Sequence, residues 1–552
     1  MKVVSKKGDD FMIQNPILKG FNPDPSICKR GDTYYIATST FEWFPGVQIY
    51  ESKDLKNWRL LVRPLNRISQ LDMVGVPDSG GVWAPCLTYE DGKFWLVYSI
   101  MREHRAFKDV RNYLVTADDI EGPWSEPIFL NASGFDPSLF HDNDGKKYLL
   151  NMIYDFRNDH PWNYGIAIQE FDEGKEQLVG KPEIIFKGTH LEKTEGPHIY
   201  FINGYYYLFT AEGGSQWGHS VTVARSKSLY GPYEVHPDNP ILTAWYSPEN
   251  DLQKTGHASL IKTDSEEWYI AYLASRPIKR KGKGLFEERG FCTLGRESAL
   301  AKIEWTADDW PTVAGGKVAQ KYVPKPNLPE CPWSSKLKKN YFASGIPSEF
   351  QTLRIPFSQK MGQITKKGLI LYGQESLYSV FEQSLLARRF ESVNFIAETA
   401  VDFSPSYFQQ SAGLVCYYNS KNWTSLQVTH NEKLGKVLTI LKCEGAKLSW
   451  PLRVPIVLTE EGNVYLRVKV NARFYQFFYS LDGKNWKELS FMFDTYKLSD
   501  DYIAKPFLGP TGSAFTGAFV GVHCNDLTGM RQEATFEYFS YQDIEEDEVT
   551  KN

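Results

Sequence analysis

The sequence predicts an all-β protein in which a five-bladed β-propeller precedes a β-sandwich. Three observations support this prediction. One short phrase recurs five times within the first three hundred residues, a proline-rich segment follows, and strand patterns then continue without the repeat. A repeated unit of 50 to 60 residues that holds several short strands is typical of propeller blades, which surround a central channel.

The recurring phrase is a polar turn with a proline or an alanine at its aligned position. The five copies are centred on Pro25, Pro85, Pro137, Pro197 and Ala258, at steps of 60, 52, 60 and 61 residues. A run rich in aromatic and aliphatic residues follows each turn, as expected for a half-buried strand. Asp-Gly or Asn-Gly pairs precede several of these runs, and they favour hairpins because such turns need positive φ. Chance turns in one large sandwich would not recur in this way.

Prolines 324, 326 and 329 interrupt the pattern. Their density predicts an extended linker, here at residues 321–345, between a propeller at 12–320 and a sandwich at 346–545. Alternating runs at 464–470 and 474–480 indicate strands with one buried face. We expect the second domain to be a structural module that favours a homo-oligomer.

Composition excludes several classes of protein. A net charge of −5 and a pI near 6.1 argue against a nucleic-acid or anionic-membrane partner. We expect no membrane segment, because no stretch approaches the ~20 apolar residues that a spanning helix needs. The N-terminus lacks the apolar core of a secretory signal. Seven scattered cysteines fit free thiols, so we expect a cytoplasmic protein.

Three of the five turns carry a carboxylate: Asp24, Asp136 and Glu195. Each alone could be an ordinary turn residue, but equivalent turns of a propeller converge on its channel. Glycoside hydrolysis needs two carboxyl groups flanking the scissile bond. We therefore predict Asp24 as an ionised general base and Glu195 as a protonated general acid. A like charge at Asp136 is expected to raise the pKa of Glu195 and to orient its side chain.

Further phrases accompany these turns in a fixed order. Together they resemble glycoside hydrolase family 43, and specifically its two-domain β-xylosidases, over nearly the whole chain. The matching segments are 22–26, 81–85, 135–138, 194–198, 211–214, 255–259, 294–298, 412–415 and 515–521. The resemblance implies a five-bladed propeller and inverting, single-displacement hydrolysis. It assigns Asp24 as general base, Glu195 as general acid and Asp136 as the modulator of the acid's pKa.

The resemblance also implies substrate-binding residues. Arg296 resembles an arginine beside the sugar in the nonreducing-end subsite, where its fixed fork of donors would hold hydroxyl groups. Phe41 and Trp83 match aromatic walls of that subsite, although packing in the core would also explain them. Phe515 matches an aromatic side chain that the second domain adds to the mouth of the site, with Phe519 as a nearby alternative.

His257 matches a histidine that lies near a calcium ion or a water molecule in the channel. Calcium prefers oxygen ligands, so the residue itself favours a histidine satisfied within the core. We expect no cofactor to be required, and a structural calcium ion at His257 is the alternative.

The predicted function is exo-acting hydrolysis that releases D-xylose from the nonreducing end of β-1,4-xylooligosaccharides. The first alternative is an α-L-arabinofuranosidase, because the two sugars present similar hydroxyl patterns. A retaining fructan- or sucrose-cleaving enzyme is disfavoured, because the chain has no Arg-Asp-Pro and no Trp-x-Asn-Asp-Pro-Asn-Gly. A carbohydrate-binding propeller without catalysis is disfavoured by the intact set of acids.

Overall fold

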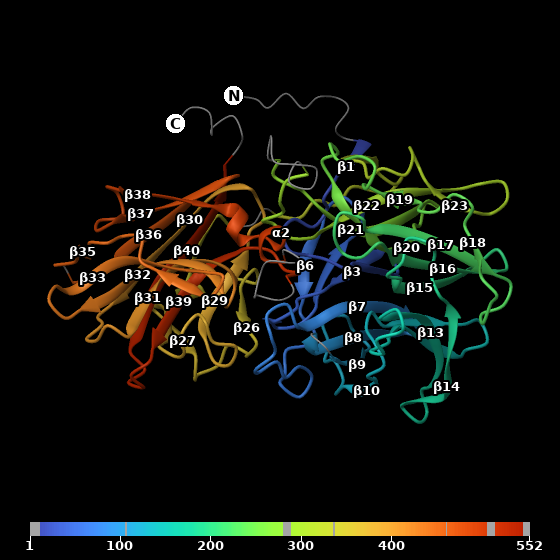
Figure 1. Ribbon diagram of the computed structural model, residues 1–552, viewed down its shortest axis with the longest axis horizontal. Helices are drawn as coiled ribbons and strands as arrows, with labels where there is room; N and C mark the ends of the chain where they lie inside the picture. Colours follow the sequence, from blue (N-terminus) through green and yellow to red (C-terminus); the bar gives the residue numbers. More distant parts are fainter. Residues whose placement is uncertain are drawn as a thin grey trace.

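The computed structural model describes residues 11–104, 107–279, 289–334, 337–459, 461–504 and 514–544. Two β-domains lie side by side, the first drawn blue to yellow-green and the second yellow to red (Figure 1). Both are built of antiparallel sheets, so the all-β prediction of a propeller followed by a sandwich is confirmed. Across the described ranges, the helices fall well short of the length and apolar character needed to cross a membrane.

The propeller has five blades within the described residues, and each is built from strands that are consecutive or nearly so along the chain. Blade one holds β2 (Ser26–Arg30), β3 (Thr33–Thr38), β5 (Gln48–Ser52) and β6 (Arg59–Val62). Blade two holds β7 (Gly81–Glu90), β8 (Lys93–His104), β9 (Lys108–Ala117) and β10 (Ile128–Asn131). Blade three holds β11 (Ser138–His141), β12 (Lys147–Tyr154), β13 (Asn163–Asp172) and β14 (Gln177–Phe186). Blade four holds β15 (Glu195–Ile202), β16 (Tyr205–Glu212), β17 (Ser220–Ser226), β18 (Glu234–Val235) and β19 (Leu242–Thr243). Blade five holds β20 (Gln253–Lys262), β21 (Trp268–Ser275), β22 (Glu297–Trp305) and β23 (Pro311–Val313).

The first strands of the five blades form a closed ring. β2 contacts β7, β7 contacts β11, β11 contacts β15, β15 contacts β20, and β20 returns to β2. Apolar side chains of neighbouring blades pack between them, as Ile49 of blade one and Leu96 of blade two do in one buried cluster. Residues near the start of each first strand are therefore brought together around one axis.

The second domain is a sandwich of two large sheets. The first sheet runs β34 (Lys447–Ser449), β33 (Gly435–Glu444), β32 (Asn422–Asn431), β31 (Gln410–Asn419), β39 (Phe519–Asp526), β29 (Ser384–Arg389), β26 (Gln351–Leu353) and β4 (Trp43–Phe44), with β35 (Ile456–Val457) beside β33. The second runs β27 (Gly362–Thr365), β28 (Gly368–Tyr372), β40 (Glu533–Asp543), β30 (Asn394–Phe403), β36 (Val464–Asn471), β37 (Phe474–Ser480) and β38 (Lys487–Asp494), with β25 (Lys339–Tyr341) beside β40. Three short helical turns complete the domain, η2 (Phe342–Ser344), η3 (Thr495–Leu498) and α2 (Asp500–Ile503).

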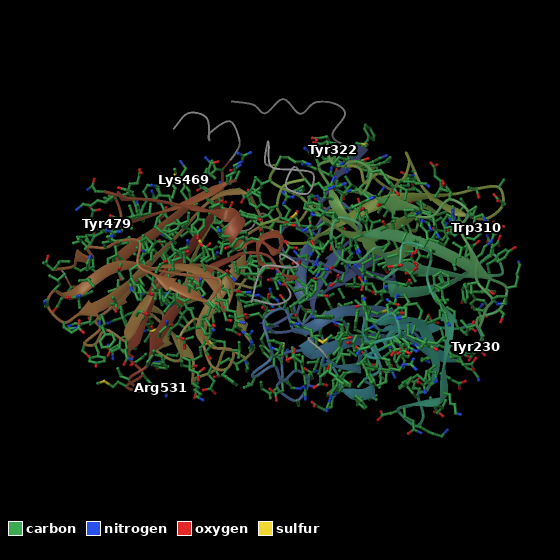
Figure 2. All side chains as sticks on the ribbon, viewed as in Figure 1. Tyr230, Trp310, Tyr322, Lys469, Tyr479 and Arg531 are labelled. Atoms are coloured by element: carbon green, nitrogen blue, oxygen red, sulfur yellow. The ribbon has the colours of Figure 1, made fainter. Side chains whose placement is uncertain are left out.

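The core of the sandwich follows from the alternating patterns in its sequence. Every second residue of β36 is buried, and Leu466 packs with Leu414 and Phe536 between the two sheets. Side chains fill this domain throughout, as they do the propeller (Figure 2). The interior is apolar, and burial of this kind stabilises a domain by about 25 cal/mol per Å² of apolar surface.

The two domains are joined through structure as well as through the connecting chain. β4 comes from the propeller sequence yet pairs with β26 of the sandwich. Trp43 of β4 stacks on Phe519, with ring centroids 3.7 Å apart. Within the segment predicted as a linker, β24 (Tyr322–Pro324) pairs with β1 (Met12–Gln14), and β25 pairs with β40. The propeller and the sandwich therefore share a sheet edge.

Candidate active site

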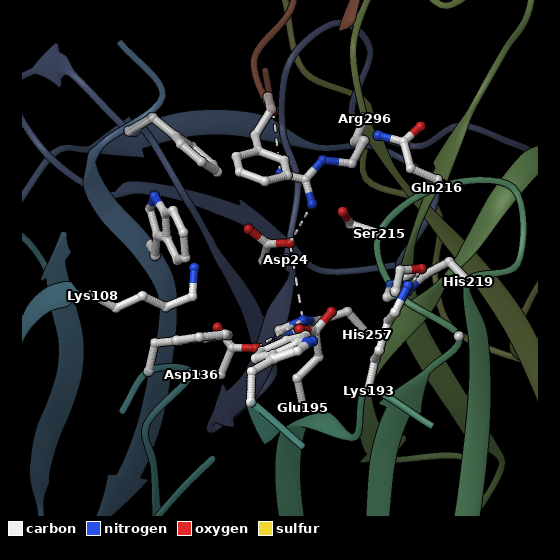
Figure 3. A pocket seen from close by; sticks show the side chains of 17 residues that line it. Asp24, Lys108, Asp136, Lys193, Glu195, Ser215, Gln216, His219, His257 and Arg296 are labelled. Atoms are coloured by element: carbon white, nitrogen blue, oxygen red, sulfur yellow. Dashed lines mark hydrogen bonds and ion pairs between the residues drawn. The ribbon is translucent and has the colours of Figure 1, made fainter. Parts of the chain in front are cut away.

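A pocket of about 330 Å³ is lined by side chains from all five blades of the propeller and from the sandwich (Figure 3). Each blade contributes at least one lining side chain from its first strand or from the turn before that strand, among them Asp24, Trp83, Asp136, Glu195 and His257. These are the residues of the recurring phrase. The repeat in the sequence therefore corresponds to the ring of first strands in space.

The backbone at these positions is unusual. Asp24, Asp136 and His257 have φ of 56°, 54° and 50°, in the left-handed region that side chains with a Cβ seldom adopt. Strain of this kind concentrates where a site requires a particular side-chain direction. The pairing register also shifts at Trp83 and at Glu195, and such bulges redirect side chains out of the regular ladder.

Asp24 is held as a carboxylate at the centre of the site. Its Oδ2 accepts a hydrogen bond from Ser39 Oγ at 2.6 Å, and its Oδ1 accepts one from Arg296 Nη1 at 3.2 Å. Burial acts to raise the pKa of Asp24, but Arg296, His257 and the Ser39 hydroxyl outweigh burial and lower the pKa below its usual value. Asp24 is therefore ionised at neutral pH, as a general base must be.

Glu195 is held in the opposite protonation state. Burial is the largest cause, the negative charge of Asp24 adds to it, and together they raise the pKa of Glu195 to about 7. Arg296, Lys108 and Lys193 act in the opposite direction. A buried carboxyl group with this pKa keeps its proton up to neutral pH, as a general acid must.

Asp136 lies beside Glu195 and differs from the sequence prediction in one respect. Its Oδ2 accepts a hydrogen bond from the backbone N–H of Gly196 at 3.1 Å, which fixes the chain next to the acid. Burial and the charges of Glu195 and Asp24 raise the pKa of Asp136 well above its usual value. The predicted direction for Glu195 agrees with the structure, but burial is the larger cause and Asp24 is the like charge that contributes most.

Gly196 is required by the packing as well as by φ. Its φ is 58°, and a Cβ there would lie 2.9 Å from the imidazole of His257. That imidazole lies between the acids, with Nδ1 3.9 Å from Asp24 Oδ1 and 4.0 Å from Asp136 Oδ2. Burial lowers the pKa of His257 below its usual value, and the charge of Asp24 acts in the opposite direction.

The surroundings of His257 do not form a calcium cage from side chains alone. The neighbouring ring is that of His198, 6.5 Å away, and the nearest carboxylates are the two acids of the site. Calcium takes six to eight oxygen ligands. Among the described residues, no group of three or more His, Cys, Asp or Glu side chains is placed to hold a metal ion.

Arg296 joins the two domains at the pocket. Besides Asp24, its guanidinium donates from Nη2 to the backbone carbonyl of Phe515 at 3.2 Å. Its carbon Cζ lies 5.6 Å from the ring of Phe41 and 5.7 Å from that of Phe515. The backbone N–H of Phe515 in turn donates to Ser79 Oγ at 3.1 Å. The sandwich therefore contributes a wall of the pocket through Phe515, whereas Phe519 is fully buried against Trp43.

Sequence reasoning missed several lining residues, which lie outside the shared phrases, in loops or, for Lys108, at the start of β9. Figure 3 shows Lys108 on one side of the pocket and Lys193, Gln216 and His219 on the other. His219 Nδ1 lies 2.9 Å from the Gly214 carbonyl, and burial lowers its pKa to about 3. Its Nε2 has no partner among the described residues. A neutral imidazole that donates from Nδ1 leaves Nε2 free to accept a hydrogen bond from a sugar hydroxyl.

Comparison with known proteins identifies the family. The model of glycosyl hydrolases family 43 matches residues 13–311, and that of the beta-xylosidase C-terminal concanavalin A-like domain matches residues 338–542. The chain belongs to glycosyl hydrolases family 43. The resemblance inferred from the recurring phrase is thus confirmed, and with it the prediction that the protein is a glycosidase.

Relatives within family 43 match both domains. The beta-xylosidase of Bacillus subtilis (strain 168) is 53% identical, with 96% of this chain and 99% of the relative covered. The xylosidase/arabinosidase 43B of Humicola insolens is 45% identical, with 97% and 98% covered. The crystal structure of xylan beta-1,4-xylosidase from Bacillus halodurans C-125 superposes with a TM-score of 0.92 at 46% identity, with 96% and 100% covered.

Proposed function

We propose that this protein is an exo-acting, inverting β-xylosidase that releases D-xylose from the nonreducing end of β-1,4-xylooligosaccharides. The observation that carries the proposal is the opposite protonation of two carboxyl groups in one pocket. Asp24 has a lowered pKa and Glu195 a raised one. The relatives named beta-xylosidase, which match over nearly their full length, support the choice of sugar.

Each acid has a defined part in the proposed reaction. Asp24 takes a proton from a water molecule as the water oxygen bonds to the anomeric carbon. Glu195 gives its proton to the glycosidic oxygen as the bond between that oxygen and the anomeric carbon breaks. The products are xylose of inverted configuration and an oligosaccharide one unit shorter, and the two acids exchange protons with solvent to restore the starting state.

The other groups prepare this chemistry. Arg296 keeps Asp24 ionised and, through its link to Phe515, fixes the mouth of the pocket. Asp136 holds the Gly196 backbone and so positions Glu195. Phe41 and Trp83 line the pocket beside Phe515, and such flat apolar faces suit the C–H faces of a sugar ring.

Proton NMR of xylobiose hydrolysis from the earliest minutes tests the proposal. An initial excess of α-xylose over the anomeric mixture released from the reducing end is expected, because a single displacement inverts the β linkage. An initial excess of β-xylose over that mixture would show retention and would make Asp24 a nucleophile. Absence of cleavage would overturn the activity itself.

The second candidate is α-L-arabinofuranosidase activity in the same pocket. A relative that is 45% identical is named xylosidase/arabinosidase, and the two sugars present similar hydroxyl patterns. The ratio of kcat/KM for 4-nitrophenyl β-D-xyloside and 4-nitrophenyl α-L-arabinofuranoside separates the two activities. A ratio above one favours the xylosidase.

We also propose the cytoplasm as the compartment. All seven cysteines are free and six of them are buried, and burial raises the pKa of Cys86 to about 11, which keeps that thiol unreactive. Thiols of this kind suit a reducing compartment. Fractionation of the producing cells, with activity assayed in each fraction, tests the assignment.

A further inference from the structure

Two phenylalanine rings are exposed together in segments that also carry lining residues of the pocket. Phe107 is 63% exposed and Phe156 is 59% exposed, yet their ring centroids are only 4.7 Å apart. A single exposed apolar side chain needs no explanation. A contacting pair beside a binding pocket is different, because exposed apolar surface next to a site often marks an extension of that site.

The pair joins two segments that each contain a residue lining the pocket. Phe107 precedes Lys108, which lines the pocket, and Phe156 lies in the 155–162 loop that ends in the lining residue Trp162. Lys108 Nζ lies 5.9 Å from the ring of Phe135 and 5.9 Å from that of Trp162. The two exposed rings thus continue a wall that already belongs to the pocket.

The loop that carries Phe156 is fixed by its neighbours. Asp155 is buried, and its backbone N–H donates to the carbonyl of Trp162 at 2.7 Å. The Asp155 carboxylate accepts hydrogen bonds from Arg157 Nε at 2.9 Å and from Arg157 Nη2 at 2.5 Å. Phe156 lies between these two residues. A surface held in this way binds a ligand without a large loss of conformational entropy.

Aromatic exposure increases from the pocket toward the solvent. Phe135 is 4% exposed, Trp162 is 36% exposed, and the rings of the two are 6.4 Å apart and within 19° of parallel. Phe156 follows at 59%. A chain whose terminal sugar reaches Asp24 and Glu195 has to leave through this mouth, and its pyranose rings present apolar C–H faces along the way.

We propose that Phe107 and Phe156 form a platform that binds xylosyl units beyond the first sugar of the leaving group. The inference rests on the proposed function, because it takes a β-1,4-linked xylooligosaccharide as the occupant. The platform makes the enzyme favour longer oligosaccharides, since xylobiose ends before reaching it. We infer a xylooligosaccharide as the ligand because the segments that carry the two rings also carry residues of the pocket that holds the acids.

The test compares xylobiose with xylotetraose for the wild type and for the double variant Phe107→Ala/Phe156→Ala. We expect kcat/KM for xylotetraose to fall about tenfold, which corresponds to about 1.4 kcal/mol, and kcat/KM for xylobiose to stay within about twofold. Phe129→Ala is the matched control, since Phe129 is 52% exposed on the outer strand β10. Equal losses on both substrates, or unchanged values for xylotetraose, overturn the platform.

A binding measurement separates the platform from the chemistry. With Glu195→Gln as background, calorimetry is expected to show xylotetraose binding more tightly than xylobiose, and the added Phe107→Ala/Phe156→Ala changes should remove that difference. Failure of the wild type to cleave any xylooligosaccharide would contradict the proposed function. The binding comparison would still show whether Phe107 and Phe156 bind the longer sugar. The platform is overturned if neither xylobiose nor xylotetraose binds to the Glu195→Gln protein. It is also overturned if the Phe107→Ala/Phe156→Ala changes alter the oligomeric state and leave the difference in binding between the two sugars unchanged.

Discussion

The propeller and the sandwich are both built of antiparallel strands, but these strands serve different roles in the two domains. In the propeller, the residues that line the pocket combine left-handed backbone, buried carboxyl groups and shifted pKa values, as at Asp24 and Asp136. In the sandwich, regular alternation such as that of β36 fills an apolar core. In these two regions, irregular backbone is found where side chains are placed for catalysis, whereas regular alternation is found where side chains form the apolar core.

The two domains nevertheless depend on each other. Arg354 of the sandwich is buried and pairs with Asp78 of the propeller at 3.0 Å. Lys254 of blade five is buried against Asp500 and Asp501 of α2, at 3.3 Å and 2.7 Å. A joint made of buried charges is sensitive to the loss of one partner, because the other charge is then left without compensation.

The largest expected effect is a loss of catalysis without a loss of stability. Glu195→Gln should lower kcat on xylobiose by about 10³-fold, within the range for loss of a general acid. The loss should be smaller for 4-nitrophenyl β-D-xyloside, whose leaving group needs no proton. The midpoint of thermal unfolding should not fall. An equal loss on both substrates would contradict the role of Glu195 as acid.

A variant in the sandwich core should have the opposite effect and lower stability without lowering kcat. Leu466→Ala should reduce the free energy of unfolding by about 2–5 kcal/mol, because it leaves a cavity between the sheets, while kcat is retained at temperatures where the protein stays folded. Urea unfolding and steady-state kinetics measure the two quantities. A change in kcat without a change in stability would contradict the assignment of catalysis to the propeller and of a purely stabilising role to the sandwich core.

A change at the joint tests how strongly the domains are coupled. Lys254→Met should lower the free energy of unfolding by about 3–5 kcal/mol, because Asp500 and Asp501 then stay buried without a cation. Adding Asp500→Asn and Asp501→Asn to the same chain should restore part of the loss. Urea unfolding of the three proteins supplies the measurement, and no recovery in the triple variant would argue against charge as the cause.

A smaller effect is expected where the sandwich enters the pocket. Phe515→Ala should raise KM for xylobiose about tenfold, since burying a phenylalanine side chain contributes about 1.5–3 kcal/mol, while the backbone carbonyl that holds Arg296 remains. Phe519→Ala is the matched control and should lower stability with little change in KM. Similar KM values for Phe515→Ala and the wild type would remove Phe515 from the binding wall.

The smallest change is a shift of the pH profile. Glu195 loses its proton as the pH rises through about 7, so kcat/KM should fall above that pH. Asp24 has a lowered pKa, so the midpoint of the acidic limb should lie below the usual aspartate value of ~3.9. Asp136→Asn removes a carboxyl group whose own pKa is raised by the charge of Glu195, and the basic limb should move to lower pH because a like charge beside Glu195 raises its pKa. Profiles from acidic to alkaline pH measure this, and an unmoved limb with unchanged kcat would exclude that role for Asp136.

The sequence was sufficient to predict the blades and the three acids, because the repeat places equivalent turns on one axis. Arg296 and Phe515 came instead from the resemblance to a family. Residues such as Lys108, Trp162 and His219 were missed, since they lie at a strand end or in loops that carry no shared phrase and meet only in the folded ring. The burial that raises the pKa of Glu195 was equally invisible, because it depends on walls that several blades and the sandwich build together.

The ion pair between Asp24 and Arg296 has a consequence for biosynthesis. The partners are 272 residues apart in the chain, and the carbonyl that steadies Arg296 comes 219 residues later still. Asp24 leaves the ribosome early, but the Arg296 guanidinium that pairs with it arrives only with the last blade, and the Phe515 carbonyl that supports Arg296 follows with the second domain. A nascent chain therefore carries its base long before the base is held in place, and hydrolytic competence requires synthesis to pass Phe515.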